Sequence, residues 1–379
     1  MAVERVLIVG GGIAGLATAA GLSRAGIACE VVERTEAWAP VGAGIVLGVN
    51  AMNVMRGLEL AEPVAERGAR LGRGAITDAR GRDIGRTDFG LLEPDLGPTI
   101  SLHRAALHDV LLAGASGVPV SLGASVEKLA LYDSHVDVRT TDGREARYDL
   151  VIGADGLRSR VRELVFGDVE IAYAGYTCWR LVVKAPFAQA EMREMWGRGK
   201  RFGIVPVSDG RVYCFAVANA PRGAVDPAEG RLERFRARFA EFGGQVPEIL
   251  AALQHPDELI HNDLEEVVDG PWVRDRVALV GDASHAMTPN MGQGAAMALE
   301  DSAVLVELLR AGGPLPAALS AYVARRQDRV RWVQTQSRRI GRLGQLENPV
   351  ACALRNGLLR LVPDRSSTAA LRKMASQPI

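Results

Sequence analysis

Two short apolar runs frame a helical stretch at the start of the chain. Residues 6–9 read V-L-I-V, an alanine- and leucine-rich segment continues to about Ala25, and residues 29–33 form the second apolar run. Short β-branched runs of this length favour buried strands, and the segment between them has the composition of a helix. The pattern therefore predicts a strand, a helix and a second strand, which together form a β-α-β unit.

The pattern changes in the middle of the chain. Between about residues 170 and 268, short β-rich runs such as 201–207 (R-F-G-I-V-P-V) and 211–217 (R-V-Y-C-F-A-V) are separated by turn residues such as 208–210 (S-D-G). Frequent turns between short strands predict a mostly antiparallel sheet. A core-strand pattern returns at residues 277–280, and a helix is predicted from about Gly294 to Arg310.

These changes divide the chain into three parts. Residues 1–70, 98–170 and 270–335 are predicted to form one discontinuous nucleotide-binding domain, residues 71–97 and 171–269 a β-sheet domain, and residues 336–379 a C-terminal helical segment. Residues 352–361 of that segment are amphipathic. We expect them to pack on the rest of the protein rather than on a membrane or a partner.

Composition narrows the possible partners. The chain has 45 basic and 45 acidic side chains, so no overall electrostatic attraction favours nucleic acid or an anionic membrane. The four cysteines form no C-x-x-C pair and are too few for a disulfide framework, which favours a cytoplasmic location. The N-terminus lacks the features of a signal peptide, and no run of 18 apolar residues predicts a membrane span. No His, Cys, Asp and Glu spacing resembles a metal site.

Glycines at the end of the first strand carry the clearest chemistry. Gly10, Gly12 and Gly15 form the pattern G-x-G-x-x-G, and Glu33 closes the second strand. In a β-α-β unit the first glycine permits a tight turn, the second lets a pyrophosphate approach the backbone, and the third lets helix and strand pack closely. The acidic residue binds ribose. This pattern predicts a dinucleotide site but leaves NAD, NADP and FAD open.

Two distant segments distinguish between these cofactors. Residues 149–162 read D-L-V-I-G-A-D-G-L-R-S-R-V-R, and residues 277–294 read V-A-L-V-G-D-A-S-H-A-M-T-P-N-M-G-Q-G. Together with the N-terminal glycines, they resemble the three signatures of the single-component FAD-dependent aromatic hydroxylases, a family that includes para-hydroxybenzoate hydroxylase and salicylate hydroxylase. The resemblance extends from about residue 3 to about residue 335.

The resemblance implies a fold and a reaction. The fold is α/β, with a Rossmann-like FAD-binding domain of the glutathione-reductase type, a mostly antiparallel β-sheet substrate domain and C-terminal helices. The reaction uses FAD, O₂, and NADH or NADPH as a transient co-substrate to hydroxylate a small aromatic or heteroaromatic substrate through a flavin C4a-hydroperoxide. That species requires a closed, dry pocket. Monomer and homodimer both remain open.

The resemblance also implies, position by position, which residues hold the cofactor. They are Gly10, Gly12, Ile13, Ala14, Gly15, Glu33, Arg34, Gly44, Arg104, Val126, Asp155, Gly156, Asp282, Pro289, Gly292, Gln293 and Gly294. Asp282, at a strand end, can accept hydrogen bonds from ribityl hydroxyls, and the helix that begins near Gly294 favours negative charge on reduced flavin. His285 has two interpretations, a general base and a residue that orients the loop, of which we favour the second.

The β-rich lobe contains the candidates for substrate contact. Arg201 and Tyr213 lie on neighbouring strands of the predicted hairpin, and we take them as candidate catalytic residues that hold and help deprotonate a phenol or an acidic heterocycle. The alternative is a pair on a sheet surface. The hairpin resembles the branch that contains FAD-dependent urate hydroxylase, but Asn290 stands where that branch has aspartate, which puts urate in doubt.

Other activities remain to be distinguished. A flavin-dependent dehydrogenase or reductase would turn over without oxygen, an NAD-dependent dehydrogenase would leave the segment near Gly281 without a role, and a non-enzymatic flavoprotein would show negligible turnover. The chain has neither a second G-x-G-x-x-G nor W-x-W-x-I-P. These absences argue against a Baeyer–Villiger type of enzyme and against a flavin halogenase.

Overall fold

The predicted β-α-β unit is present, at the centre of a parallel sheet. The computed structural model describes residues 3–38, 43–185, 187, 191–377 and 379. The unit consists of β1 (Arg5–Val9), α1 (Ile13–Arg24) and β2 (Ala28–Glu33), and β1 pairs in parallel with β2. Val6 and Ile8 pack against helices, whereas Leu7 and Val9 face a small sheet on the other side. Burial on both faces explains why this strand is so apolar from Val6 to Val9.

Six strands of the described chain form this sheet, in the order β18-β19-β12-β1-β2-β8. The remaining four are β8 (Val120–Leu122), β12 (Leu150–Gly153), β18 (Val273–Arg274) and β19 (Val277–Leu279). β1, β12 and β19 are parallel neighbours, so the loops that begin at Gly10, Ala154 and Val280 meet at one edge of the sheet. This edge is where ligands bind in folds of this kind.

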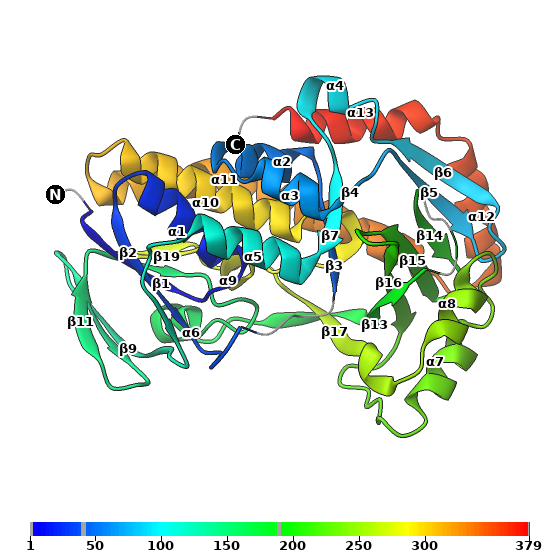
Figure 1. Ribbon diagram of the computed structural model, residues 1–379, viewed down its shortest axis with the longest axis horizontal. Helices are drawn as coiled ribbons and strands as arrows, with labels where there is room; N and C mark the ends of the chain where they lie inside the picture. Colours follow the sequence, from blue (N-terminus) through cyan, green and yellow to red (C-terminus); the bar gives the residue numbers. More distant parts are fainter. Residues whose placement is uncertain (1–2, 39–42, 186, 188–190, 378) are drawn as a thin grey trace.

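The second sheet is mostly antiparallel, as the sequence predicts. In the described residues it has seven strands, in the order β17-β13-β16-β15-β14-β5-β6, and only β14 and β5 pair in parallel. The strands are β5 (Arg73–Asp78), β6 (Asp83–Asp88), β13 (Ile171–Lys184), β14 (Met192–Trp196), β15 (Lys200–Pro206), β16 (Arg211–Asn219) and β17 (Ile260–Val267). Helices α7 (Arg231–Phe239) and α8 (Val246–Ala252) cover its outer face, where Phe235 and Phe239 of α7 pack near Phe202 of β15 (Figure 1).

Short elements complete both parts of the molecule. Two three-stranded sheets contain β3 (Gly44–Leu47), β7 (Ile100–His103) and β4 (Ala69–Arg70), and β9 (Val126–Leu131), β10 (Val136–Thr140) and β11 (Glu145–Tyr148). The other short helices are α2 (Val49–Gly57), α3 (Ala61–Arg67), α4 (Glu93–Leu96), α5 (Arg104–Gly114), α6 (Arg160–Phe166) and α9 (Asp282–His285), with 3₁₀ turns η1 (Pro256–Glu258) and η2 (Pro289–Met291).

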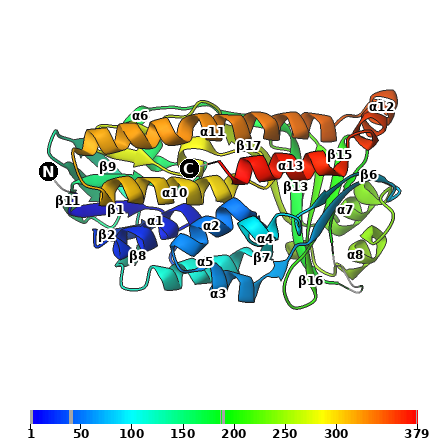
Figure 2. The same ribbon diagram turned by 90° about the horizontal axis from the view of Figure 1, so that it is seen from above.

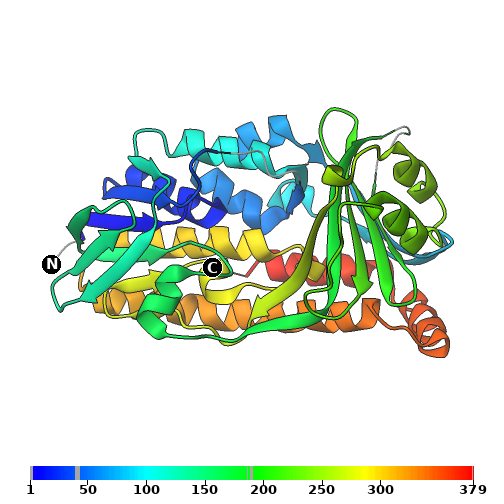
Figure 3. The same ribbon diagram turned by 90° about the horizontal axis from the view of Figure 1, so that it is seen from below.

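Two long helices connect the two sheets. The predicted helix is confirmed as α10 (Gly294–Arg310), and α11 (Leu315–Gly344) then runs lengthwise past both sheets (Figures 2 and 3). The predicted boundary between residues 335 and 336 falls inside this continuous helix. A helix of 30 residues spans about 45 Å, which is long enough to serve both parts of the molecule.

The end of the chain forms α12 (Pro349–Arg360) and α13 (Asp364–Ala375). α13 packs along β6, where Asp364 and Thr368 accept hydrogen bonds from the backbone N–H groups of Arg86 and Asp88. α12 packs beside β6 with Cys352 and Arg355 buried, although most of its large apolar side chains are exposed. Among the described residues, no helix is long and apolar enough to cross a membrane.

Candidate active site

A cavity of about 470 Å³ lies between the parallel sheet and the seven-stranded sheet. Most of the residues assigned to cofactor or substrate line it: Gly12, Ile13, Ala14, Gly44, Arg104, Gly156, Arg201, Tyr213, Asp282, Pro289, Gly292, Gln293 and Gly294. Six others lie outside its wall: Gly10, Gly15, Glu33, Arg34, Val126 and Asp155. The wall thus combines three segments that are far apart in the sequence.

The three glycines of the first loop have two different structural roles. Gly10 has a φ of +109°, and a Cβ there would lie 2.4 Å from the carbonyl oxygen of Ala154. A Cβ on Gly15 would lie 1.9 Å from the carbonyl oxygen of Gly10, so both residues allow close backbone packing. A Cβ on Gly12 would meet nothing within 4 Å, and this residue borders the cavity. Gly12 therefore leaves the backbone N–H groups at the start of α1 accessible to a phosphate.

Glu33 lies next to this loop. Its carboxylate accepts hydrogen bonds from the N–H of Gly11 at 2.7 Å and from the Thr35 hydroxyl at 2.5 Å. Although partial burial raises the pKa of Glu33, these bonds hold it below its ordinary value. Arg34 is exposed, and Val126 is buried below the sheet. A ribose carboxylate at this position is therefore compatible with the geometry, and the assignment of these residues remains a prediction.

Asp155 stabilises the loop that follows β12. Its carboxylate accepts hydrogen bonds from the Ser159 hydroxyl at 2.5 Å and from the N–H of Arg160 at 2.7 Å, so it caps the start of α6. Arg162 donates to the carbonyls of Ala283, at 2.6 Å, and Leu157, at 2.7 Å. These contacts connect the loop after β12 to the loop after β19. Gly156, with a φ of +79°, then borders the cavity.

Asp282 presents its carboxylate to the cavity. The side chain is exposed to that space, but protein surrounds it, and this burial raises the pKa of Asp282 while His285 and Arg104 lower it. A carboxylate that is largely removed from water is stabilised when hydroxyl groups of a bound ligand donate hydrogen bonds to it. The geometry therefore fits the predicted contact with ribityl hydroxyls.

A buried ion-pair network holds the helix behind Asp282. Asp301 lies 2.5 Å from Nε2 of His285 and accepts from Nε of Arg326 at 2.8 Å. Burial raises the pKa of Asp301, but His285 and Arg326 outweigh that effect and lower it. His285 is not part of the cavity wall. This placement supports the interpretation that His285 orients the loop.

Glu300 extends the network to the cavity. It accepts from Arg326 at 2.6 Å and from Asn50 at 2.7 Å, and Asn50 also donates to Gln293 at 3.0 Å. The side-chain oxygen of Asn50 is buried and has no hydrogen-bond partner among the described residues. Sequence reasoning missed Asn50, because no motif marks it.

Arg201 is buried at the other end of the cavity, with only 2% of its side chain exposed. Its guanidinium donates to Glu194 at 3.1 Å, to Gln345 at 3.0 Å and to Asn290 at 2.7 Å. Glu194 and Gln345 were not predicted, since they come from β14 and from the end of α11. The carboxylate of Glu194 compensates the charge of Arg201, which makes this arginine a weak anchor for an anionic substrate.

Tyr213 and Arg201 border the same cavity but are not partners. In the β15–β16 register, Arg201 lies opposite Val217 and Tyr213 opposite Val205. Tyr213 instead lies near Arg180 of β13, a residue that sequence reasoning did not select. Burial raises the pKa of Tyr213 above its ordinary value of 10, although the positive charge of Arg180 lowers it. The hydroxyl is therefore a neutral donor. Arg201 and Tyr213 border one cavity without contacting each other, and their catalytic assignment stays a prediction.

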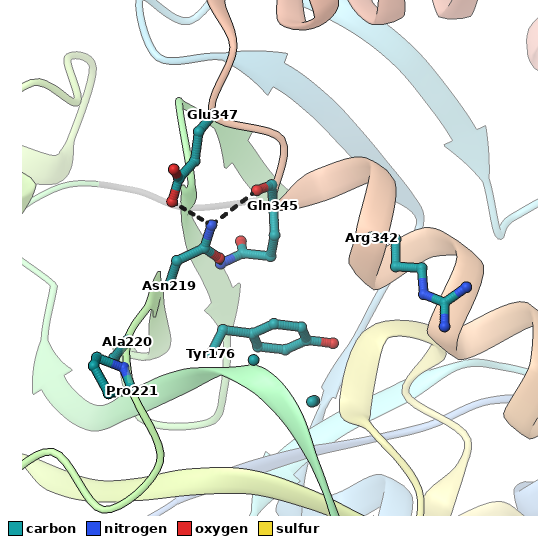
Figure 4. Close-up of a pocket in the computed structure, with 9 residues that line it drawn as sticks. Tyr176, Asn219, Ala220, Pro221, Arg342, Gln345 and Glu347 are labelled. Carbon is teal, nitrogen blue, oxygen red and sulfur yellow. Dashed lines mark hydrogen bonds between the residues drawn. The ribbon is translucent and has the colours of Figure 1, made fainter.

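A second depression, of about 530 Å³, lies at the surface near Tyr176 (Figure 4). Asn219 donates to Glu347 at 2.6 Å and to the backbone carbonyl of Gln345 at 3.0 Å, as the dashed lines show. The Tyr176 hydroxyl accepts from Asn290, which borders the first cavity. This depression has no glycine loop or helix start among its described wall residues, so it lacks the features of a dinucleotide site.

The first cavity fits FAD by its own geometry. Gly12 and Gly292 leave open space where a side chain would otherwise project, Asn50 has an unpartnered buried oxygen, and Asp282 presents an acceptor. Arg104 adds a positive charge at the wall. Among the described residues, no group of His, Cys, Asp and Glu side chains could hold a metal ion.

Comparisons with known proteins agree with this geometry. Residues 4–337 match the family model described as FAD binding domain. The chain is 40% identical over 379 residues to aurachin C monooxygenase/isomerase of Stigmatella aurantiaca, covering 99% of this chain and 98% of that protein. It is 38% identical over 371 residues to 2-heptyl-3-hydroxy-4(1H)-quinolone synthase of Pseudomonas aeruginosa, covering 95% of each.

A solved structure shows the same fold. Klebsiella pneumoniae HpxO in complex with FAD and uric acid has a TM-score of 0.90 at 29% identity, covering 98% of this chain and 96% of that chain. The family match covers most of the chain, and the relatives span nearly all of it. The chain therefore belongs to the FAD binding domain family, and it is an FAD-dependent monooxygenase of the aromatic hydroxylase type.

Proposed function

We propose that the protein hydroxylates an oxo-heteroaromatic ring of the 4-quinolone kind that carries an aliphatic side chain, with NADH or NADPH as the electron donor. Bound FAD would accept a hydride from the nicotinamide and activate O₂, so that one oxygen atom enters the ring and the other leaves as water. Two relatives support this substrate class, because their names concern a quinolone and aurachin C oxygenation.

The observation that carries the proposal is the chemical division of the cavity wall. On the seven-stranded sheet, Arg180 and Tyr213 provide donors next to apolar side chains such as Phe215. On α13 and the nearby α4 region, the wall consists of Leu371, Met374 and Leu92. Ring oxygens need donors and alkyl chains need apolar surface, so a ring with a chain matches both parts.

The donors also suit the chemistry of hydroxylation. A hydrogen bond from Arg180 or from neutral Tyr213 to a ring oxo group would stabilise the deprotonated, enolate-like form of the ring, whose carbon is the nucleophile toward an electrophilic oxygen. Arg201 is less suited to this role, because Glu194 already compensates its charge. Asn290, in place of the aspartate expected for urate, holds Arg201 through a neutral contact.

The experiment is a coupled assay on the FAD-loaded protein. NADH and NADPH oxidation, oxygen uptake and peroxide release are measured with 4(1H)-quinolones that carry alkyl chains of increasing length at position 2, with urate and with hydroxybenzoates. We expect the alkylquinolones to accelerate oxidation with little peroxide, and the longer chains to lower KM. Better coupling with urate or hydroxybenzoate would overturn the substrate class. Oxygen-independent turnover would favour a dehydrogenase.

A further inference from the structure

The helix α12 turns an apolar face away from the protein. Val350, Leu354 and Leu358 are spaced by four residues, so they lie on one face of the helix, with exposed fractions of 65%, 62% and 66%. Leu361, just after the helix, is 79% exposed and Val362 is 45% exposed. A run of large exposed apolar side chains on one helix face is typical of a docking surface.

This orientation is held by specific contacts on the opposite side of the helix. Arg355 is buried, donates to the carbonyl of Leu343 at 2.9 Å, and lies 5.1 Å from the ring centre of Trp196. Arg360 donates to the carbonyl of Asp83 at 3.0 Å. Because polar contacts fix the inner face, the apolar face points outward in the folded protein. Figures 2 and 3 show α12 at one end of the molecule, between the ends of α11 and α13.

Basic side chains outnumber acidic ones around α12. Residues 342–365 contain four arginines and two acidic residues, Glu347 and Asp364, which stand directly before and after residues 348–363. Arg342, at the end of α11, and Arg365, at the start of α13, are exposed and form no ion pair among the described residues. Exposed apolar residues flanked by arginines are the pattern of helices that lie in the interface of an anionic bilayer.

We propose that α12 docks the protein on the surface of an anionic phospholipid bilayer. The apolar face of Val350, Leu354, Leu358 and Leu361 enters the interface, and Arg342 and Arg365 contact lipid phosphates. A second copy of the chain fits less well, because a helix of 12 residues is about 18 Å long and one face of it falls short of the roughly 800 Å² per partner of a stable dimer.

The surface is continuous with the candidate active site along the chain. α13 directly follows α12 and contributes Leu371 and Met374 to the cavity wall. A lipophilic ring with an alkyl chain partitions into membranes, so docking would bring the protein to its substrate. The docking itself rests on α12 and does not depend on the substrate class.

The test is flotation of the FAD-loaded full chain with vesicles of phosphatidylcholine alone and of phosphatidylcholine with phosphatidylglycerol. We expect binding to the anionic vesicles, weakened by salt, and at least about tenfold weaker binding for the double variant Leu354→Gln/Leu358→Gln. The matched control is Leu122→Gln/Val225→Gln, which removes two exposed apolar side chains elsewhere. It should bind as the unaltered protein does.

Two further measurements keep the proposal open to refutation. Arg342→Gln/Arg365→Gln should reduce the preference for anionic over neutral vesicles without lowering the melting temperature, so it tests the proposal even if the leucine variant fails to fold. Absence of binding by the unaltered chain would overturn the proposal. A dimer in light scattering that Leu354→Gln/Leu358→Gln converts to a monomer, without vesicle binding, would also overturn it.

Discussion

Nη2 of Arg201 donates a hydrogen bond to Oδ1 of Asn290 at 2.7 Å, and this contact joins the seven-stranded sheet to the loop after β19. Nδ2 of Asn290 in turn donates to the Tyr176 hydroxyl and to the carbonyl of Ser337, both at 2.9 Å. Gly341 and Gly344 of α11 permit this approach, because a Cβ at either position would collide with Tyr176 or Arg201. One set of contacts therefore holds the seven-stranded sheet and the loop after β19 together.

We expect Glu194→Gln to change the charge preference of the cavity. Removing the carboxylate leaves Arg201 uncompensated, so anionic rings such as hydroxybenzoates should bind better while neutral quinolones bind no better. KM values for both classes measure the effect. Glu145→Gln, at an exposed carboxylate, is the control. An equal KM change for both classes would contradict the assignment.

Gly12→Ala should weaken FAD binding, whereas Gly15→Ala should lower the stability of the protein. A Cβ added at position 15 would lie 1.9 Å from a backbone oxygen, so the second variant should lose about 3 kcal/mol or more of stability. The methyl added at position 12 meets no protein atom, so the first variant should keep its melting temperature but bind FAD more weakly. Thermal unfolding of the apoprotein and FAD titration separate the two outcomes. Equal loss of FAD affinity without destabilisation in both variants would refute the distinction.

Asp301→Asn should destabilise the protein by about 3 to 5 kcal/mol, because it removes the buried carboxylate that His285 and Arg326 share, so that Arg326 keeps only the Glu300 carboxylate. The folded pKa of Asp301 lies below its ordinary value of 3.8, so its contribution is present above pH 3.8 and is lost as pH falls below that value. Urea unfolding at neutral and acid pH measures both effects. Asp328→Asn, at an exposed carboxylate, should change neither.

Tyr213→Phe should lower kcat/KM for quinolones by about tenfold to a hundredfold, because the deprotonated ring loses one hydrogen bond to its negatively charged oxygen. Because the pKa of Tyr213 is raised, its hydroxyl remains protonated at working pH and is not a base. The pH profile should therefore keep its shape in the variant. Loss of a titration limb from that profile would show that Tyr213 ionises during turnover.

Leu371→Phe should shift the preference toward shorter alkyl chains. The larger side chain fills part of the apolar wall that α13 provides, so long chains lose contact or clash. The ratio of kcat/KM values across chain lengths reports this change independently of overall activity. An unchanged ratio would place the chain elsewhere in the cavity.

The sequence by itself determined the local elements and the cofactor loops. Strand β1 and helix α10 follow directly from apolar periodicity, and Gly10 and Gly15 mark places where backbone segments touch. These features are local, because the side-chain period and the tolerance of glycine depend on a few neighbouring residues. What assigned the three separated motifs to one site before any fold was described was their resemblance to the signatures of the aromatic hydroxylases, because local patterns do not show which distant segments meet.

Only the tertiary structure decided which side chains meet. Arg201 takes its partners from residues 194, 290 and 345, and Tyr213 lies near Arg180 rather than in contact with Arg201. The periodicity of a strand shows which residues share a face, but not which distant residues approach that face. The exposed face of α12 also depends on tertiary contacts. From the sequence alone Leu354 and Leu358 would be assigned to the core, but the contacts of Arg355 orient the helix so that both leucines face outward. The equal numbers of basic and acidic side chains in the whole chain also did not predict the excess of arginine around α12, because a total charge says nothing about where the charges lie.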